Sequence, residues 1–191
     1  VFNQCTSKEG PGFSARYWNN KEYEGNAAAT AQLTTPFRLC TSGATVFAPG
    51  VNLTDFSAIY QSVFTPQETG EVIFNFYSCG ATQLLINGEE VKKFTNKHGG
   101  RGQAYAMHAE AGKPYDIEIR FQYFSGDAQL NFDLGFKEEV NIKNTVAKVK
   151  DADVVIFAGG ISPSLEGEEM GVNLPGFRKG DRTDIELPAV Q

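Results

Sequence analysis

Apolar and polar residues alternate most regularly in the middle of the chain, over residues 70–91. One face of this extended segment is strongly apolar and carries Val72, Phe74 and Phe76. Cys79-Gly80 indicates a turn, and Asn87-Gly88 is well suited to a two-residue hairpin because both residues accept a positive φ. The pattern therefore predicts two consecutive hairpin turns in an antiparallel sheet.

Other segments with the same period-two pattern lie on both sides of this centre. They are Phe13–Trp18, residues 56–64, residues 115–121 and the alternating Leu130, Phe132 and Leu134. About eight strands with turn residues between them predict a mainly β fold, an antiparallel β-sandwich or a barrel, over residues 13–136. Residues 1–12 are expected to be a polar lead-in, residues 21–53 irregular edge structure, and residues 94–102 a flexible polar loop.

The pattern changes after Phe136. Ile142, Val146 and Val149 have helical spacing, and the following run of residues 154–158 is apolar on both faces, as in a strand buried in a parallel sheet. A long loop over residues 161–182 follows Gly159-Gly160. Residues 137–191 are thus expected to form an incomplete α/β segment (helix, strand, loop), and the chain is expected to be an excised fragment.

Composition narrows the classes of function. The 191 residues carry a formal net charge of -6, which argues against nucleic acid or an anionic membrane surface as a partner. No apolar run approaches the ~18 residues of a membrane span. Cys5, Cys40 and Cys79 have no metal-like spacing, so one disulfide (for example Cys5 with Cys40) and buried free thiols both stay open. No cofactor is expected.

The loop after the apolar run carries the candidate chemistry. Glu166, Glu168 and Glu169 stand close together, and crowded carboxylates keep one group protonated near neutral pH, as a general acid requires. A solvated acidic loop is the alternative. Asp181-Arg182 fits either an ion pair within the loop or a contact to substrate.

Two resemblances meet in this chain. The tail, with Asp-Val-Val-Ile-Phe-Ala-Gly-Gly at 153–160, Ser-Leu-Glu-Gly-Glu at 164–168 and Gly-Asp-Arg-Thr-Asp at 180–184, resembles the second catalytic domain of glycoside hydrolase family 3. Residues 10–136 resemble a protective-antigen-type (PA-14) β-sandwich, through Ala-Arg-Tyr-Trp-Asn at 15–19, Thr-Gly-Glu-Val-Ile-Phe at 69–74 and Leu-Leu-Ile-Asn-Gly at 84–88. In a subset of family 3 enzymes such a module is inserted just before this tail.

The resemblance implies part of an exo-acting retaining β-glucosidase or β-xylosidase. It places the acid/base on Glu166, with Glu168 as the fallback. Asp181 and Arg182 remain the candidate substrate contacts of the same loop. The nucleophile of the family is an Asp in a Ser-Asp-Trp sequence on a barrel domain, and no Ser-Asp-Trp occurs here. The chain alone is therefore expected to be inactive and to need that missing barrel domain as its partner. The expected substrates are oligosaccharides and aryl or alkyl β-glycosides.

The sandwich has candidate contacts of its own. Phe94 and Arg101 belong to a segment that would shape the aglycone end of the substrate site, and Trp18, Tyr23 and Phe94 are either ring-stacking or core aromatics. Calcium-dependent members of the fold use adjacent Asp residues, whereas this chain has Ser78-Cys79, so no metal site is expected. The alternative function is a non-catalytic carbohydrate-binding or adhesion module. A periplasmic or secreted location is expected by analogy.

Overall fold

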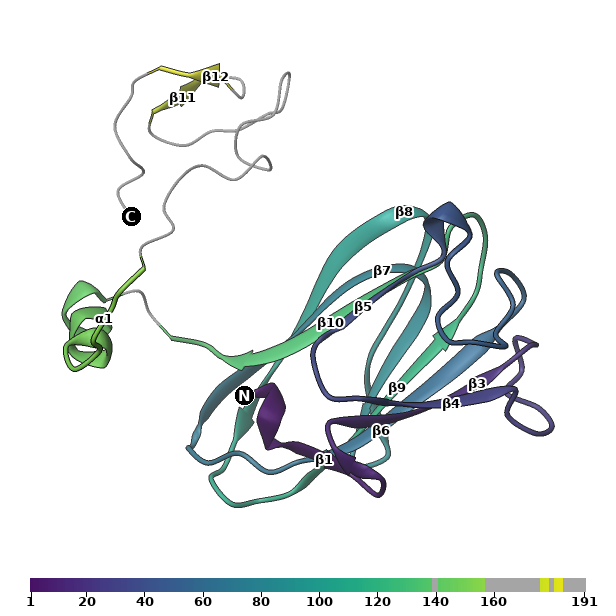
Figure 1. Cartoon of the computed structure of the whole chain (residues 1–191), viewed down its shortest axis with the longest axis horizontal. Coiled ribbons are helices and arrows are strands. Elements are labelled where there is room, and N and C mark those ends of the chain that lie inside the picture. Colours follow the sequence, from purple (N-terminus) through teal and green to yellow (C-terminus); the bar gives the residue numbers. More distant parts are fainter. Residues whose placement is uncertain (139–140, 157–175, 179–180, 184–191) are drawn as a thin grey trace. The chain divides into compact units, whose positions relative to one another are not determined.

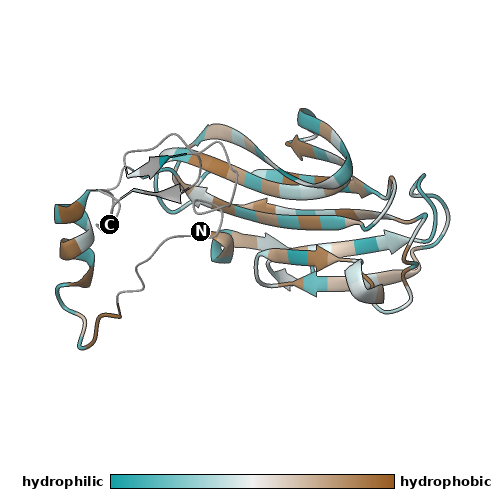
Figure 2. Cartoon of the chain, turned by 90° about the horizontal axis from the view of Figure 1, so that it is seen from above, coloured by the Kyte–Doolittle hydropathy of each residue, from teal (hydrophilic) through white to brown (hydrophobic). Residues whose placement is uncertain are grey.

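A computed structural model describes residues 1–138, 141–156, 176–178 and 181–183 of this chain. The chain divides into two compact units, Val1–Lys137 and Glu138–Gln191. The first unit is a ten-stranded antiparallel sheet that folds over on itself into two layers (Figures 1 and 2). The predicted mainly β sandwich is confirmed.

The first unit contains ten strands and two 3-10 turns. One turn, η1 (Phe2–Gln4), precedes the strands and the second one, η2 (Ser42–Ala44), follows the fifth strand. The ten strands are β1 (Cys5–Ser7), β2 (Gly10–Pro11), β3 (Phe13–Trp18), β4 (Ala29–Leu33), β5 (Phe37–Cys40), β6 (Ser57–Phe64), β7 (Gly70–Ile86), β8 (Glu89–Ala109), β9 (Tyr115–Gln122) and β10 (Gln129–Phe136).

The long strand β7 belongs to both layers. Its first part pairs with β10 from Val72 to Cys79, and its last part pairs with β9 from Ala81 to Ile86. The chain bends between the two parts at Gly80, which has a φ of 145°. A Cβ at Gly80 would lie 2.4 Å from the Phe121 ring, so only glycine fits this corner.

The turn predicted at Cys79-Gly80 is therefore wrong, because β7 continues through these residues as a bulge. The hairpin predicted at Asn87-Gly88 is confirmed: φ is 52° at Asn87 and 81° at Gly88, and β8 returns along the whole of β7. One hairpin, instead of two consecutive ones, forms the centre of the fold.

The core between the layers is mostly aromatic. Phe132 of β10 lies 5.6 Å from Phe13, 5.3 Å from Phe37 and 5.0 Å from Phe76, measured between ring centroids. Phe37 also lies 4.8 Å from Tyr60 in the facing layer. Strand β9 shows the alternation most clearly, since Tyr115, Ile117, Ile119 and Phe121 are all buried. These rings hold the two layers together.

The amino-terminal residues, expected to be a lead-in, are instead part of the sandwich. Phe2 packs 5.5 Å from Phe13 between ring centroids, and Cys5 is fully buried in the core. Strand β1 pairs with the end of β6, opposite Phe64. Burial raises the pKa of the Cys5 thiol to about 12, so this cysteine stays neutral. Cys5, Cys40 and Cys79 are all free thiols.

The flexible polar loop predicted over residues 94–102 is also wrong, because these residues lie within β8. The edge structure expected over residues 21–53 contains β4, which pairs only with β3, and β5 at the end of the sheet order. Polarity misled the prediction for β8, since Thr95, Lys97 and His98 are exposed strand residues.

The second unit contains the predicted helix, α1 (Ile142–Val149), whose amino end is capped by the Asn141 side chain accepting from the Asn144 N–H at 3.2 Å. The buried strand predicted from residue 154 is not seen where the chain is described: Val154–Ile156 form no strand, and Ile156 is 88% exposed. Two short strands, β11 (Phe177–Arg178) and β12 (Asp181–Arg182), pair with each other. No helix among the described residues is long and apolar enough to cross a membrane.

Replacing Gly12 by alanine is expected to destabilise the first unit by about 3 kcal/mol, combining positive-φ strain with overpacking. Gly12 has a φ of 86°, and a Cβ there would stand 2.0 Å from the Leu33 carbonyl oxygen, a backbone atom that cannot rotate away. Urea denaturation measures the effect. Gly10→Ala is the matched control, because Gly10 also has a positive φ but has nothing within 4 Å. Equal losses in the two variants would contradict the steric explanation.

Candidate functional site

The most distinctive surface of the first unit is a four-residue excursion of β8. After a one-residue register shift between Leu84 and Leu85, the pairing with β7 runs to Gly80↔Asn96 and resumes at Ser78↔Arg101, so residues 97–100 face the single residue Cys79. These four residues, Lys97-His98-Gly99-Gly100, are called the β8 bulge. It lies at the corner where β7 passes from one layer to the other. Bulges re-aim side chains and are common beside binding sites.

Hydrogen bonds fix the base of the β8 bulge. The Asn96 side-chain amide donates to the Ser78 carbonyl at 2.8 Å, and the Ser125 hydroxyl donates to the Lys97 carbonyl at 2.8 Å. Asn96 is buried, and a buried amide with a partner is a stable anchor. The excursion is therefore held at both its first residue and the residue before it.

Two exposed aromatic rings flank the β8 bulge. Tyr77 is 44% exposed and Phe124 is 43% exposed, whereas the other rings of the first unit are largely covered. The Lys97 ammonium nitrogen lies 5.1 Å from the Phe124 ring centroid, and a Cβ on Gly100 would stand 2.1 Å from the Tyr77 ring. Glycine at position 100 thus lets the backbone lie flat against Tyr77. Exposed rings beside donor groups suit the apolar faces and hydroxyls of a sugar.

The residues beneath the β8 bulge are closed off. The Ser78 and Thr82 hydroxyls bond to each other at 2.8 Å and both are fully buried. Burial raises the pKa of the Cys79 thiol, and the nearby Asp127 and Cys40 raise it further. The hydrogen bond from the Gly99 backbone N–H lowers this pKa and offsets the increase only in part. A neutral thiol and a paired hydroxyl are poor ligands for a hard cation. Among the described residues, no three His, Cys, Asp or Glu side chains gather as a metal site would need.

The sequence-predicted site residues are divided between the two units of the chain. Phe94 is half-buried and packs edge-on against Phe76, with 5.7 Å between ring centroids, whereas Arg101 is exposed immediately after the β8 bulge. Asp181 and Arg182 form β12 in the second unit. Glu166 and Glu168 lie outside the described residues. Trp18 is a core residue whose indole N–H donates to the Gly25 carbonyl at 3.1 Å.

Sequence reasoning missed Tyr77 and Phe124. The available signal for Tyr77 is its place on the solvent face of an alternating strand, where a large ring is unusual. Phe124 lies two residues after the end of β9, immediately before Ser125-Gly126, and carries no such pattern. Only the fold brings both rings to the same bulge.

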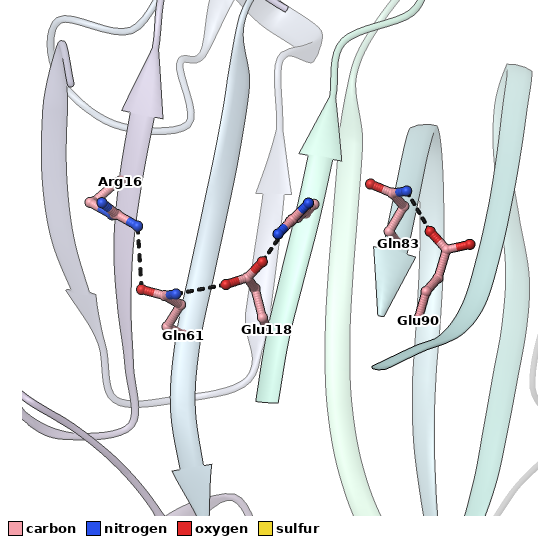
Figure 3. A network of polar contacts seen from close by, with 6 residues as sticks. Arg16, Gln61, Gln83, Glu90 and Glu118 are labelled. Atoms are coloured by element: carbon pink, nitrogen blue, oxygen red, sulfur yellow. Dashed lines mark hydrogen bonds and ion pairs between the residues drawn. The ribbon is translucent and has the colours of Figure 1, made fainter. Parts of the chain in front are cut away.

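A second polar surface lies on the solvent face of the sheet and is drawn in Figure 3. The Gln61 side chain accepts from Arg16 at 3.4 Å and donates to Glu118 at 2.7 Å, and Arg120 donates to Glu118 at 2.5 Å. These side chains come from β3, β6 and β9, so the row runs across the strands. Gln83 and Glu90 form a separate pair on β7 and β8, 2.6 Å apart.

Comparison with known proteins identifies the sandwich. The PA14 domain family matches residues 9–153, and the chain belongs to this family. The chain is 41% identical to a xylan 1,4-beta-xylosidase of Xylanibacter ruminicola, over 98% of this chain and 22% of that protein. The recognised resemblance to PA-14 sandwiches and to β-xylosidases is thus confirmed.

Solved structures agree on the fold. The crystal structure of a beta-glucosidase from Kluyveromyces marxianus in complex with glucose superposes with a TM-score of 0.59 at 14% identity, covering 95% of this chain and 21% of that one. The A domain of epithelial adhesin 6 from Candida glabrata, in complex with Galβ1-3GlcNAc, has a TM-score of 0.52 at 14% identity, covering 68% and 81%. The chain spans about a fifth of the length of the glycosidases it matches.

Proposed function

We propose that this chain is part of a larger exo-acting retaining β-glycosidase of glycoside hydrolase family 3, of β-xylosidase or β-glucosidase type. The observation that carries the proposal is the reach of the β-xylosidase similarity. The PA14 match ends at residue 153, whereas the 41% identity extends over 98% of the chain. The segment after the sandwich, which carries Glu166, is therefore part of the likeness to the enzyme.

In this proposal Glu166 is the general acid and base, and Glu168 is the fallback. A retaining glycosidase uses one carboxylic acid to protonate the leaving oxygen and a second carboxylate, ~5–5.5 Å away, to attack the anomeric carbon. The acid then acts as a base on water. The second carboxylate belongs to a barrel domain that is not in this sequence, so the chain alone is inactive. Two carboxyl groups suffice for the reaction, and no cofactor enters it.

The sandwich has a supporting role in this proposal. Tyr77, Phe124 and the exposed Arg101 beside the β8 bulge contact the aglycone part of the substrate, while Asp181 and Arg182 are the candidate contacts in the second unit. The support is the exposure of both rings at one anchored bulge. The substrates are oligosaccharides and aryl or alkyl β-glycosides, and the location is periplasmic or secreted.

The double variant Tyr77→Ala/Phe124→Ala in the larger enzyme is expected to raise KM for long xylo-oligosaccharides about five- to 100-fold, since each of the two ring contacts contributes about 0.5–1.5 kcal/mol. Activity on a small aryl β-xyloside should stay unchanged, because that substrate does not reach the rings. Steady-state kinetics on both substrates make the measurement. Gln83→Ala is the control, because Gln83 lies on β7 away from the β8 bulge and is paired with Glu90. A KM that rises equally for both substrates would contradict the role of the rings.

The second candidate function is a non-catalytic carbohydrate-binding or adhesion module. The observation in its favour is the combination of an adhesin-like fold with exposed aromatic rings on the sandwich. Two measurements distinguish the glycosidase proposal from the binding-module proposal. Strong binding of this chain on a glycan array, together with hydrolysis by the larger protein that does not change when Glu166 is substituted, supports the binding module.

A further inference from the structure

A groove of roughly 1050 Å³ crosses the solvent face of the first unit, away from the β8 bulge. Its floor is formed by β3, β6 and β9, with β4 along one side, and the turn between β1 and β2 contributes Lys8 and Glu9. No residue of the β8 bulge and neither of its flanking rings lines the groove. It is therefore a separate surface.

The floor of the groove is the polar row of Figure 3, formed by Arg16, Gln61, Glu118 and Arg120. Neighbouring strands lie about 4.8 Å apart, so the row presents planar polar groups on three successive strands, one each on β3 and β6 and two on β9. The Glu118 carboxylate is held on both sides, by the Gln61 amide and the Arg120 guanidinium. These bonds fix the orientation of the groups before any ligand arrives, which lowers the cost of binding.

The row keeps hydrogen-bonding capacity after its internal bonds are made. Arg120 donates to Glu118 through Nε, which leaves its terminal N–H groups for another acceptor. Gln61 uses one N–H and its carbonyl oxygen, and the Glu118 oxygens can each accept a second bond. Donors and acceptors thus alternate along the floor, and a hydroxyl group, which both donates and accepts, satisfies such an arrangement.

The wall beside β4 is also preorganised. The Gln32 amide donates to the Gly10 and Pro11 carbonyls, at 3.2 and 2.5 Å, and its oxygen accepts from the Ser7 hydroxyl at 3.2 Å. These contacts join β4 to the β1–β2 turn. The groove is therefore shaped by side chains that are already bonded.

Positive and negative side chains line the groove in equal numbers. Three cations, Lys8, Arg16 and Arg120, face three anions, Glu9, Asp116 and Glu118. A nucleic acid or a polyanionic glycan requires a net positive surface, which this groove lacks. No exposed aromatic or large aliphatic anchor lines it, so it does not fit an apolar peptide.

We propose that this groove binds a neutral oligosaccharide lying across strands β3, β6 and β9, at a site separate from the β8 bulge. Uncharged hydroxyls match both the neutral charge balance and the alternation of donors and acceptors. Such a site would hold a glycan chain on the sandwich, and it does not depend on Glu166 or on the glycosidase proposal.

Binding of xylohexaose and cellohexaose to the full 191-residue chain tests this inference by titration calorimetry. Thr30→Trp is the blocking variant: Thr30 is exposed, lies opposite Arg16 and lines the groove, so an indole there occupies the space. We expect loss of binding. Gln61→Ala should weaken binding about two- to tenfold, the range for one lost hydrogen bond.

Gln83→Ala is the matched control, because its pair with Glu90 lies on the same sheet face but does not line the groove. It should bind like the unaltered chain, and thermal unfolding confirms that each variant is folded. The inference is overturned if neither hexaose binds, or if Thr30→Trp binds as well as the unaltered chain. It is also overturned if Tyr77→Ala/Phe124→Ala alone abolishes binding, or if Thr30→Trp instead dissolves a dimer of the chain.

Discussion

Phe132→Ala is expected to lower the free energy of unfolding of the first unit by about 3–5 kcal/mol. The Phe132 side chain is 1% exposed and touches rings from both layers of the sandwich, including Phe13 at 5.6 Å and Phe76 at 5.0 Å between centroids. Its removal leaves a cavity between rings that are tied to their strands and cannot close the space. Because domains are stable by only about 5–15 kcal/mol, most of the stability is at stake.

Urea denaturation followed by tryptophan fluorescence measures this loss. The chain has a single tryptophan, Trp18, which is buried in the first unit and so reports on that unit. Phe124→Ala is the control, since its ring is 43% exposed and should change stability by less than about 0.5 kcal/mol. Similar losses in the two variants would show that Phe132 is not the centre of the core.

The sandwich could be predicted from the sequence because most of its strands alternate cleanly. Strand β9 and the hairpin at Asn87-Gly88 followed directly from period and turn chemistry. The role of Gly80 cannot be predicted in this way, because a glycine between two apolar runs indicates a break in regular pairing but does not distinguish a chain reversal from a bulge. The pairing of β7 with β10 and β9, which are distant in sequence, decides the matter.

Other errors have similar physical causes. Residues 97–100 are polar and glycine-rich, but backbone pairing of the flanking β8 residues, not side-chain burial, makes that segment part of a strand. Phe2 and Cys5 do not belong to an alternating apolar and polar pattern in the sequence. Their burial therefore depends on the strands that face them in the fold. The run at 154–156 is apolar on both faces, which suits a strand covered on both sides, but no strand among the described residues pairs with it. Tyr77 and Phe124, the two rings that flank the β8 bulge, are distant in sequence and come together only in the folded sandwich.

Glu166→Gln in the larger enzyme is expected to lower kcat on alkyl β-xylosides about 10²–10⁴-fold, the usual contribution of general acid–base catalysis. An alkoxide is a poor leaving group, so bond cleavage needs the proton that Glu166 supplies. Steady-state kinetics measure the loss. Glu168→Gln is the control two residues away, and it should keep most of the activity. A large loss only in Glu168→Gln would move the acid/base role to that residue.

The most direct test of the glycosidase proposal compares leaving groups in the Glu166→Gln enzyme. A dinitrophenyl β-xyloside has a leaving group that needs no proton, so the first step should proceed and the glycosyl-enzyme should accumulate. Azide, which needs no base, should then attack the anomeric carbon, displace the enzyme carboxylate and restore turnover with a β-xylosyl azide product. That result is the one we predict. Glu166→Gln activity within about twofold of the unaltered enzyme on alkyl β-xylosides, with no azide product, would contradict the proposal.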